Sequence, residues 1–173
     1  MILLSVGTQL PFDRLTKTVD EWAARLGRDD VVAQIGPTSY RPVAMKSFAF
    51  LDHDRFRALQ EECSVFVSHA GMGSIITAME LGKPIIILAR DHRRGEHRNG
   101  HQLATIRQFI RTAGVYPAES EAEVTKLLDQ ADSLAPPNGL PSTAPADFIG
   151  RLEGYVQNLP PPTLWQRLRK PAD

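Results

Sequence analysis

The sequence predicts an α/β fold in which flanking helices cover a Rossmann-like, mainly parallel sheet. Short β-branched runs alternate along the chain with segments whose apolar residues recur at helical spacing, which is the pattern of successive strand–helix units. The chain has 173 residues and 42% of them are hydrophobic, which suits one domain with a single packed core. We place this domain at residues 1–158 and treat residues 159–173 as a C-terminal tail.

Three strands and one helix are expected in the first third of the chain. Ile2–Val6 is a mostly apolar run, typical of a strand buried on both faces. Val31–Ile35 is a second such run and ends at a Gly-Pro turn, and Met45–Phe50 is a third strand. The segment between the first two strands has one apolar helical stripe, formed by Leu15, Val19, Trp22, Ala23 and Leu26.

The middle of the chain predicts two helices on either side of a glycine-rich turn. Asp54–Cys63 is amphipathic and precedes a buried fourth strand at Val65–Val67. The turn Ser68–Ser74 contains two glycines and leads into a helix that runs to about Leu81. A Gly-Lys-Pro sequence then ends that helix before the strand Ile85–Leu88.

The last part of the chain predicts a basic loop, one more strand and three helices. A Ser-Glu-Ala-Glu capping box opens the second of these helices, and prolines separate it from the third. The expected elements are the loop Arg90–Gly100, the helix His101–Thr112, the strand Gly114–Tyr116, the helix Ser120–Ala131 and the helix Ala146–Gln157. In the tail, Leu164, Trp165 and Leu168 lie beside three basic residues, which indicates either contact with a membrane or partner, or a frayed terminus.

Composition excludes several classes of function. Lys plus Arg and Asp plus Glu number 20 each, so no overall charge draws the chain to nucleic acid. The single cysteine, Cys63, allows no internal disulfide and fits a reducing compartment. The N-terminus lacks the pattern of a signal peptide, and the longest apolar run is far below the roughly 20 residues that span a bilayer. We expect a cytoplasmic protein, attached at most to a membrane surface.

The glycine-rich turn is the first candidate site. It follows the fourth strand and starts a helix, so unpaired backbone N–H groups and the helix dipole favour phosphate there. Gly71 and Gly73 allow close backbone approach, and Ser74 offers a hydroxyl. His69 stands beside them and is our candidate catalytic residue. The alternative is that the glycines serve the turn sterically.

The basic loop after the fifth strand is the second candidate site. Cationic and imidazole side chains concentrate there, and the loop opens on the same sheet edge as the glycine turn. The residues in question are Arg90, His92, Arg93, Arg94, His97, Arg98 and His101. A solvated basic loop is the plain alternative. A metal site is not favoured, because the His-Glu-x-x-His and paired-cysteine patterns are missing.

The turn after the first strand is the third candidate site. Gly7, Thr8 and Gln9 follow Ile2–Val6 on the same sheet edge, where a ligand is within their reach. Asp13 and Arg14 are interpreted as helix-start and surface charges only. Nucleophilic catalysis is poorly supported because Ser68 and Ser74 lack a Gly-x-Ser-x-Gly elbow.

These residues together resemble the C-terminal half of family 28 glycosyltransferases. The matching segments are Val6–Thr8, Phe12–Leu15, Ser68–Ser74, Leu81–Pro84, Glu96–His97 and His101–Ala104. The resemblance covers roughly residues 2 to 130 and joins several separated motifs. It is closest to split enzymes, namely the small catalytic subunit of the eukaryotic dolichol-linked GlcNAc transferase and bacterial exopolysaccharide subunits. The pattern around Arg90 and Glu96 favours the bacterial branch.

The resemblance implies the donor-binding half of a GT-B enzyme. It implies that the turn Ala70–Ser74, including Met72, holds the diphosphate of a UDP-sugar. It also implies that His101 and Gln102 face the donor sugar. Residues Gly7, Thr8, Gln9, Arg90, Glu96 and His97 complete the expected donor site. One departure concerns Thr77, which stands where related enzymes place a glutamate that binds donor hydroxyls.

The function we expect is an inverting transfer in exopolysaccharide synthesis. The donor would be UDP-glucuronate, UDP-galactose or UDP-GlcNAc, and the acceptor a polyprenyl-diphosphate-linked saccharide. Since the chain is too short for two α/β domains, a membrane-anchored partner would bind the acceptor, supply the general base and bring this chain to the inner face of the cytoplasmic membrane. No metal or cofactor is expected, because the helix start stabilises the departing UDP. Arg90 or Arg93 would recognise the carboxylate of UDP-glucuronate.

Three other functions stay open from the sequence. The chain is alternatively a catalytically silent donor-binding or enhancer subunit, a nucleotide-sugar epimerase-like protein, or a plain α/β interaction module. Turnover with a partner, conversion of UDP-GlcNAc without acceptor, and calorimetry with UDP distinguish these alternatives.

Overall fold

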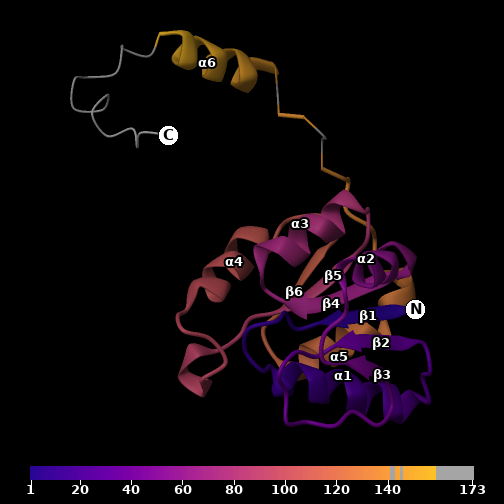
Figure 1. Ribbon diagram of the computed structural model, residues 1–173. Coiled ribbons are helices and arrows are strands. Elements are labelled where there is room, and N and C mark those ends of the chain that lie inside the picture. Colours follow the sequence, from indigo (N-terminus) through magenta and orange to yellow (C-terminus); the bar gives the residue numbers. More distant parts are fainter. Residues whose placement is uncertain (141–142, 145, 159–173) are drawn as a thin grey trace. The chain divides into compact units, whose positions relative to one another are not determined.

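The structure is a computed structural model that describes residues 1–140, 143–144 and 146–158. It comprises two compact units, Met1–Leu140 and Pro141–Asp173. The first unit contains a six-stranded, all-parallel sheet in the order β3-β2-β1-β4-β5-β6 (Figure 1). The strands are β1 (Ile2–Ser5), β2 (Val31–Gln34), β3 (Lys46–Phe48), β4 (Val65–His69), β5 (Ile85–Leu88) and β6 (Val115–Ala118). The predicted Rossmann-like α/β fold is therefore confirmed.

Alternate residues of β1, β4 and β5 enter separate cores on the two faces of the sheet. Ile2 and Leu4 of β1 belong to one core, which also contains Leu15 of α1 (Asp13–Leu26) and Val124 of α5 (Glu121–Asp129). Leu3 belongs to the other core, which is covered by α2 (His53–Glu62), α3 (Met72–Glu80) and α4 (His101–Phe109) (Figure 1). Because side chains alternate along a strand, one apolar run supplies both layers.

The predicted elements are all present; β5 and α6 have the predicted bounds and the others have shifted ends. Strand β4 continues two residues beyond its predicted end, to His69, and α4 ends at Phe109 rather than at Thr112. The basic loop contains a short 3-10 turn, η1 (His92–Arg94), and another, η2 (Ala131–Ser133), follows α5. Ser120 accepts the Glu123 N–H at 3.3 Å, so the capping box forms as predicted.

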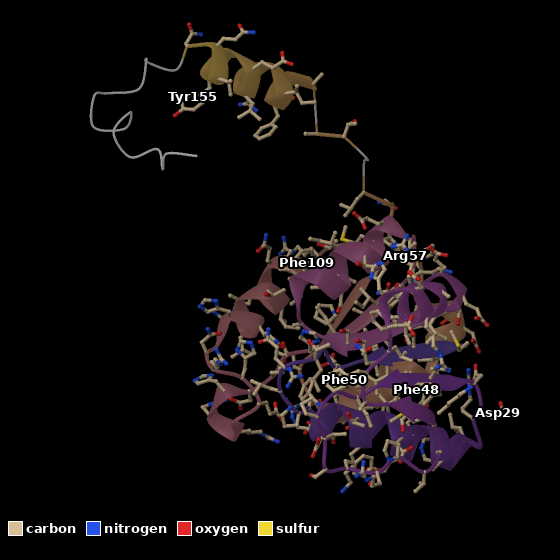
Figure 2. The ribbon with its side chains drawn as sticks, viewed as in Figure 1. Asp29, Phe48, Phe50, Arg57, Phe109 and Tyr155 are labelled. Carbon is tan, nitrogen blue, oxygen red and sulfur yellow. The ribbon has the colours of Figure 1, made fainter. Side chains whose placement is uncertain are left out.

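The second unit contains the predicted last helix, α6 (Ala146–Gln157). Tyr155 on this helix is exposed (Figure 2), as are Phe148, Ile149, Leu152 and Val156. Their spacing places them in one stripe along the helix. The unit boundary at residue 140 precedes the expected domain end at 158, so this helix groups with the C-terminal residues. The tail at 159–173 lies outside the described residues. Over the described ranges, no helix has the length and apolarity needed to cross a bilayer.

Candidate functional site

A pocket of about 390 Å³ opens where β1, β4 and β5 end. The sheet order reverses direction between β1 and β4, and ligands of open α/β sheets bind at such a switch point. The pocket brings together all three segments predicted from the sequence. Its walls are formed by Val6, Gly7, Thr8, Gln9, Leu10, His69, Ala70, Gly71, Met72, Arg90, His97, His101, Gln102 and Thr105.

Three residues of the expected donor site do not line this pocket, namely Gly73, Ser74 and Glu96. The basic-loop residues His92, Arg93, Arg94 and Arg98 do not line it either. Gly73 and Ser74 lie in the first turn of α3, directly behind Met72. The backbone N–H groups of Met72, Gly73 and Ser74 have no partner among the described residues, and no side chain caps the helix. This helix start therefore presents free donors and the positive end of its dipole beside the pocket.

His69 packs between the two glycine-containing turns. A Cβ atom on Gly71 would lie 2.4 Å from His69 Nε2, and one on Gly7 would lie 3.1 Å from Cε1. Gly7 also has a φ of +81°, in the left-handed region that favours glycine. Glycine is therefore favoured at position 71 because the imidazole occupies the space, and at position 7 mainly because of its backbone conformation.

The hydrogen bonds of His69 determine its tautomer. The Ser68 hydroxyl donates to Ser5 O at 2.8 Å, so its oxygen can only accept from His69 Nδ1, which lies 3.3 Å away. Nδ1 therefore carries the proton and Nε2 is left as an acceptor. Burial, with the nearby Arg90 charge, lowers the pKa of His69 from 6.5 to about 4. The imidazole is neutral at pH 7.

Arg90 is buried, at 3% exposure, and its guanidinium binds main-chain carbonyls. Nη1 donates to Pro11 O at 2.6 Å and to Glu96 O at 3.0 Å, while Nη2 donates to Leu10 O at 2.8 Å and to Val6 O. Burial lowers its pKa to about 10, so the group stays charged at neutral pH. Four of the five guanidinium N–H groups of Arg90 are therefore used, and only Nε–H stays available to a donor carboxylate.

Arg93, the other residue expected to recognise a carboxylate, does not line this pocket. It binds Asp91 through two bonds of 3.1 Å and lines a separate pocket, of about 410 Å³, between α4 and the start of α5. Glu96 was expected in the donor site, but its carboxylate binds Arg14 and accepts from Nε and Nη2 at 2.8 Å each. The interpretation of Arg14 as a mere surface charge is therefore wrong.

Gln102 has one free donor. Its Oε1 accepts the Arg90 N–H at 3.0 Å, and since that N–H can only donate, the amide orientation is fixed. Nε2 has no partner among the described residues and belongs to a side chain that lines the pocket. Thr105, one turn beyond His101 on α4, also lines the pocket and was missed by the sequence reasoning. Helical spacing from His101 is the signal that points to it.

No Asp or Glu appears among the described residues that line the pocket, although the whole chain carries 20 of them. Within the described part of the chain, no three His, Cys, Asp or Glu side chains gather as metal ligands would. Free backbone N–H groups, imidazoles and the side-chain amide nitrogen of Gln102 surround the space. Such a lining suits an anion with attached hydroxyl groups.

Sequence comparison identifies the family of the chain that carries this site. Residues 1–146 match the sequence model of the glycosyltransferase family 28 C-terminal domain. The chain belongs to glycosyltransferase family 28. A human relative of this family 28 domain is the UDP-N-acetylglucosamine transferase subunit ALG13, which is 28% identical over an alignment covering 90% of the chain. The chain spans only about 15% of the length of that protein.

Solved structures share the fold of this family 28 domain. The solution structure of ALG13 superposes with a TM-score of 0.56 at 18% identity, covering 87% of this chain and 93% of that one. The glycosyltransferase of kitacinnamycin gives 0.56 at 19% identity, over 76% of this chain and 34% of that one. A UDP-GlcNAc 2-epimerase from Methanocaldococcus jannaschii gives 0.56 at 12% identity, over 89% and 45%. The six-stranded parallel sheet matches that of GT-B glycosyltransferases.

Proposed function

We propose that this domain binds the UDP-sugar donor of a two-chain inverting glycosyltransferase. A separate, membrane-anchored chain would bind a polyprenyl-diphosphate-linked saccharide and complete the active site, as part of exopolysaccharide synthesis. The observation that carries the proposal is the pocket at the switch point, which combines the free N–H groups of Met72–Ser74 with a lining that contains no carboxylate among its described residues. The name of the human relative, a UDP-N-acetylglucosamine transferase subunit, supports the donor class.

In the proposed reaction, the free backbone N–H groups at the start of α3 stabilise UDP as it leaves. As the bond between the sugar and the diphosphate breaks, negative charge grows on the β-phosphate. Preorganised N–H donors stabilise that charge without reorganisation, so the transfer needs no metal ion. The same donors bind the ground-state diphosphate more weakly, because its charge is smaller.

His69 and Gln102 are assigned to the sugar side of the pocket. The unprotonated His69 Nε2 repels a phosphate oxygen but accepts a hydrogen bond from a hydroxyl. The free Gln102 Nε2 donates to a sugar oxygen, and His97 and His101 complete this wall. The general base comes from the acceptor-binding chain, since the pocket offers no carboxylate from the described residues.

Reconstitution tests the proposal. The purified chain, its partner and a lipid-linked acceptor are incubated with UDP-GlcNAc, UDP-galactose and UDP-glucuronate. We expect transfer from one of them, reduced at least about tenfold by His69→Ala and by Gln102→Ala. Undiminished turnover in both variants would remove the site assignment. Assembly with UDP binding but without turnover would indicate a non-catalytic donor-binding subunit. Flotation with liposomes, with and without the partner, tests the peripheral location.

A further inference from the structure

A nearly buried ion pair connects α1 with the loop that follows β5. Arg14 binds both oxygens of Glu96 at 2.8 Å, a fork geometry that fixes the two side chains relative to each other. The side chains are only 15% and 12% exposed. Arg14 Nη2 also donates to Ala89 O at 3.0 Å, which ties the pair to the end of β5.

Glu96 makes further bonds on its own side of the pocket. Its Oε2 accepts the Asp91 N–H at 2.8 Å, and its carbonyl oxygen accepts from Arg90 Nη1 at 3.0 Å. Its own N–H donates to Asp91 O at 3.2 Å. Glu96 thus closes residues 91–96 into a fixed loop that directly precedes His97.

Arg90 extends this network to the opposite wall. Its guanidinium binds the carbonyls of the turn after β1, including Leu10 and Pro11. The ring of Phe12 lies 4.7 Å from the Arg90 guanidinium and 5.2 Å from that of Arg14, so both cations contact one buried ring. The loops that carry Gly7–Leu10 and His97–Gln102 are therefore joined through Arg14, Glu96 and Arg90.

The charges of the pair are stabilised by this arrangement. The hydrogen bond to Glu96 raises the pKa of Arg14. Burial opposes ionisation of Glu96, but the bonds from Arg14 and from the Asp91 N–H outweigh it and lower its pKa. Removal of Arg14 takes from Glu96 the fork that offsets its burial, whereas removal of Glu96 leaves Arg14 with only Glu121, 3.5 Å away on its other side. In either case the fixed geometry of the pair is lost, so the loop must rearrange.

We infer that Arg14 and Glu96 are positioning residues which, through Arg90, set the separation of the two walls of the donor pocket. We call Arg14, Glu96 and Arg90 the clamp. Neither Arg14 nor Glu96 lines the pocket, so they act on the donor only through the loops they hold. The consequence for donor affinity rests on the proposed function.

The first experiment tests the clamp without any ligand. Backbone ¹⁵N relaxation is measured on Glu96→Gln and Arg14→Lys, the latter keeping the charge but losing the fork. We expect the order parameters of Thr8–Leu10, more than 80 positions away from Glu96 along the chain, to fall from about 0.85 to below about 0.6 in Glu96→Gln, with a smaller fall in Arg14→Lys. The control is Glu61→Gln, which breaks the exposed pair with Arg57 on α2 (Figure 2). Unchanged order parameters in both clamp variants would overturn the inference.

The second experiment measures UDP affinity by calorimetry at a temperature where every variant is folded. We expect Glu96→Gln to weaken binding about tenfold, Arg14→Lys to weaken it less, and Glu61→Gln to match the wild type. Wild-type affinity in both clamp variants would refute the link between clamp and donor. If the wild type itself does not bind UDP, the proposed function fails, and the order parameters still decide whether the clamp exists.

Discussion

Replacement of Gly71 by alanine tests the packing of His69 directly. At Gly71 the backbone φ of −92° suits any residue, so the effect of the new methyl group is purely steric. The Cβ would lie 2.4 Å from His69 Nε2 and 3.0 Å from Cδ2. Since unstrained contacts between such atoms begin at about 3.5 Å, the imidazole must retreat by about 1 Å. Overpacking of this kind destabilises a fold by about 1–3 kcal/mol.

The assay is a double-mutant cycle of urea unfolding followed by circular dichroism. Gly71→Ala is measured in the wild type and in His69→Ala, where the space beside the glycine is free. We expect the loss of about 1–3 kcal/mol in the first background to fall to near zero in the second. Gly73→Ala is the matched control, because its new methyl group meets no heavy atom within 4 Å apart from those of its chain neighbours and its own helix backbone, and it should be neutral or slightly stabilising. An equal loss in both backgrounds would show that His69 does not occupy that space.

Three further outcomes are expected. The pKa of His69 is lowered from 6.5 to about 4 in the folded state, so the unfolded chain binds more protons between these pH values. The free energy of unfolding should therefore fall by about 2 kcal/mol as the pH falls from 7 to 4.5. In His69→Ala this part of the pH dependence should be absent. Gln102→Glu keeps the acceptor for the Arg90 N–H but replaces the free donor with an oxygen. The midpoint of unfolding should therefore match that of the wild type, while UDP affinity measured by calorimetry falls at least about tenfold. Gln102→Leu, which also loses the acceptor, should lower the free energy of unfolding by about 1–3 kcal/mol. Asp20→Ala leaves the Tyr40 hydroxyl and the Val43 and Ala44 N–H groups without their buried acceptor, and should lower the free energy of unfolding in urea by about 3 kcal/mol or more. A loss below about 1 kcal/mol would show that these bonds do not stabilise the fold.

Local sequence patterns were sufficient to predict the sheet and its helices. The apolar run at Ile85–Leu88 and the capping box at Ser120 depend on neighbours within a few residues, so the sequence displays them directly. The gathering of the turns after β1, β4 and β5 was also predictable. It follows from parallel strand direction alone, since parallel strands end at one edge of the sheet.

The partners of charged side chains could not be predicted in the same way. Arg90 and Arg93 lie three positions apart in one basic loop, yet the first is buried on main-chain carbonyls and the second is exposed beside Asp91. Arg14 meets Glu96 across 82 positions. Which cation remains available to a ligand depends on these long-range contacts, and no periodicity in the sequence records them.

The way Arg90 binds the turn after β1 affects how freely that turn can change. Carbonyl oxygens are common to every amino acid, so the anchoring of Leu10 and Pro11 does not depend on their side chains. Thr8 and Gln9 line the pocket but contribute nothing to this anchoring. The turn can therefore exchange those two side chains while its path is preserved, which makes positions 8 and 9 a natural place for evolution, or a designed library, to alter which ligand the pocket accepts.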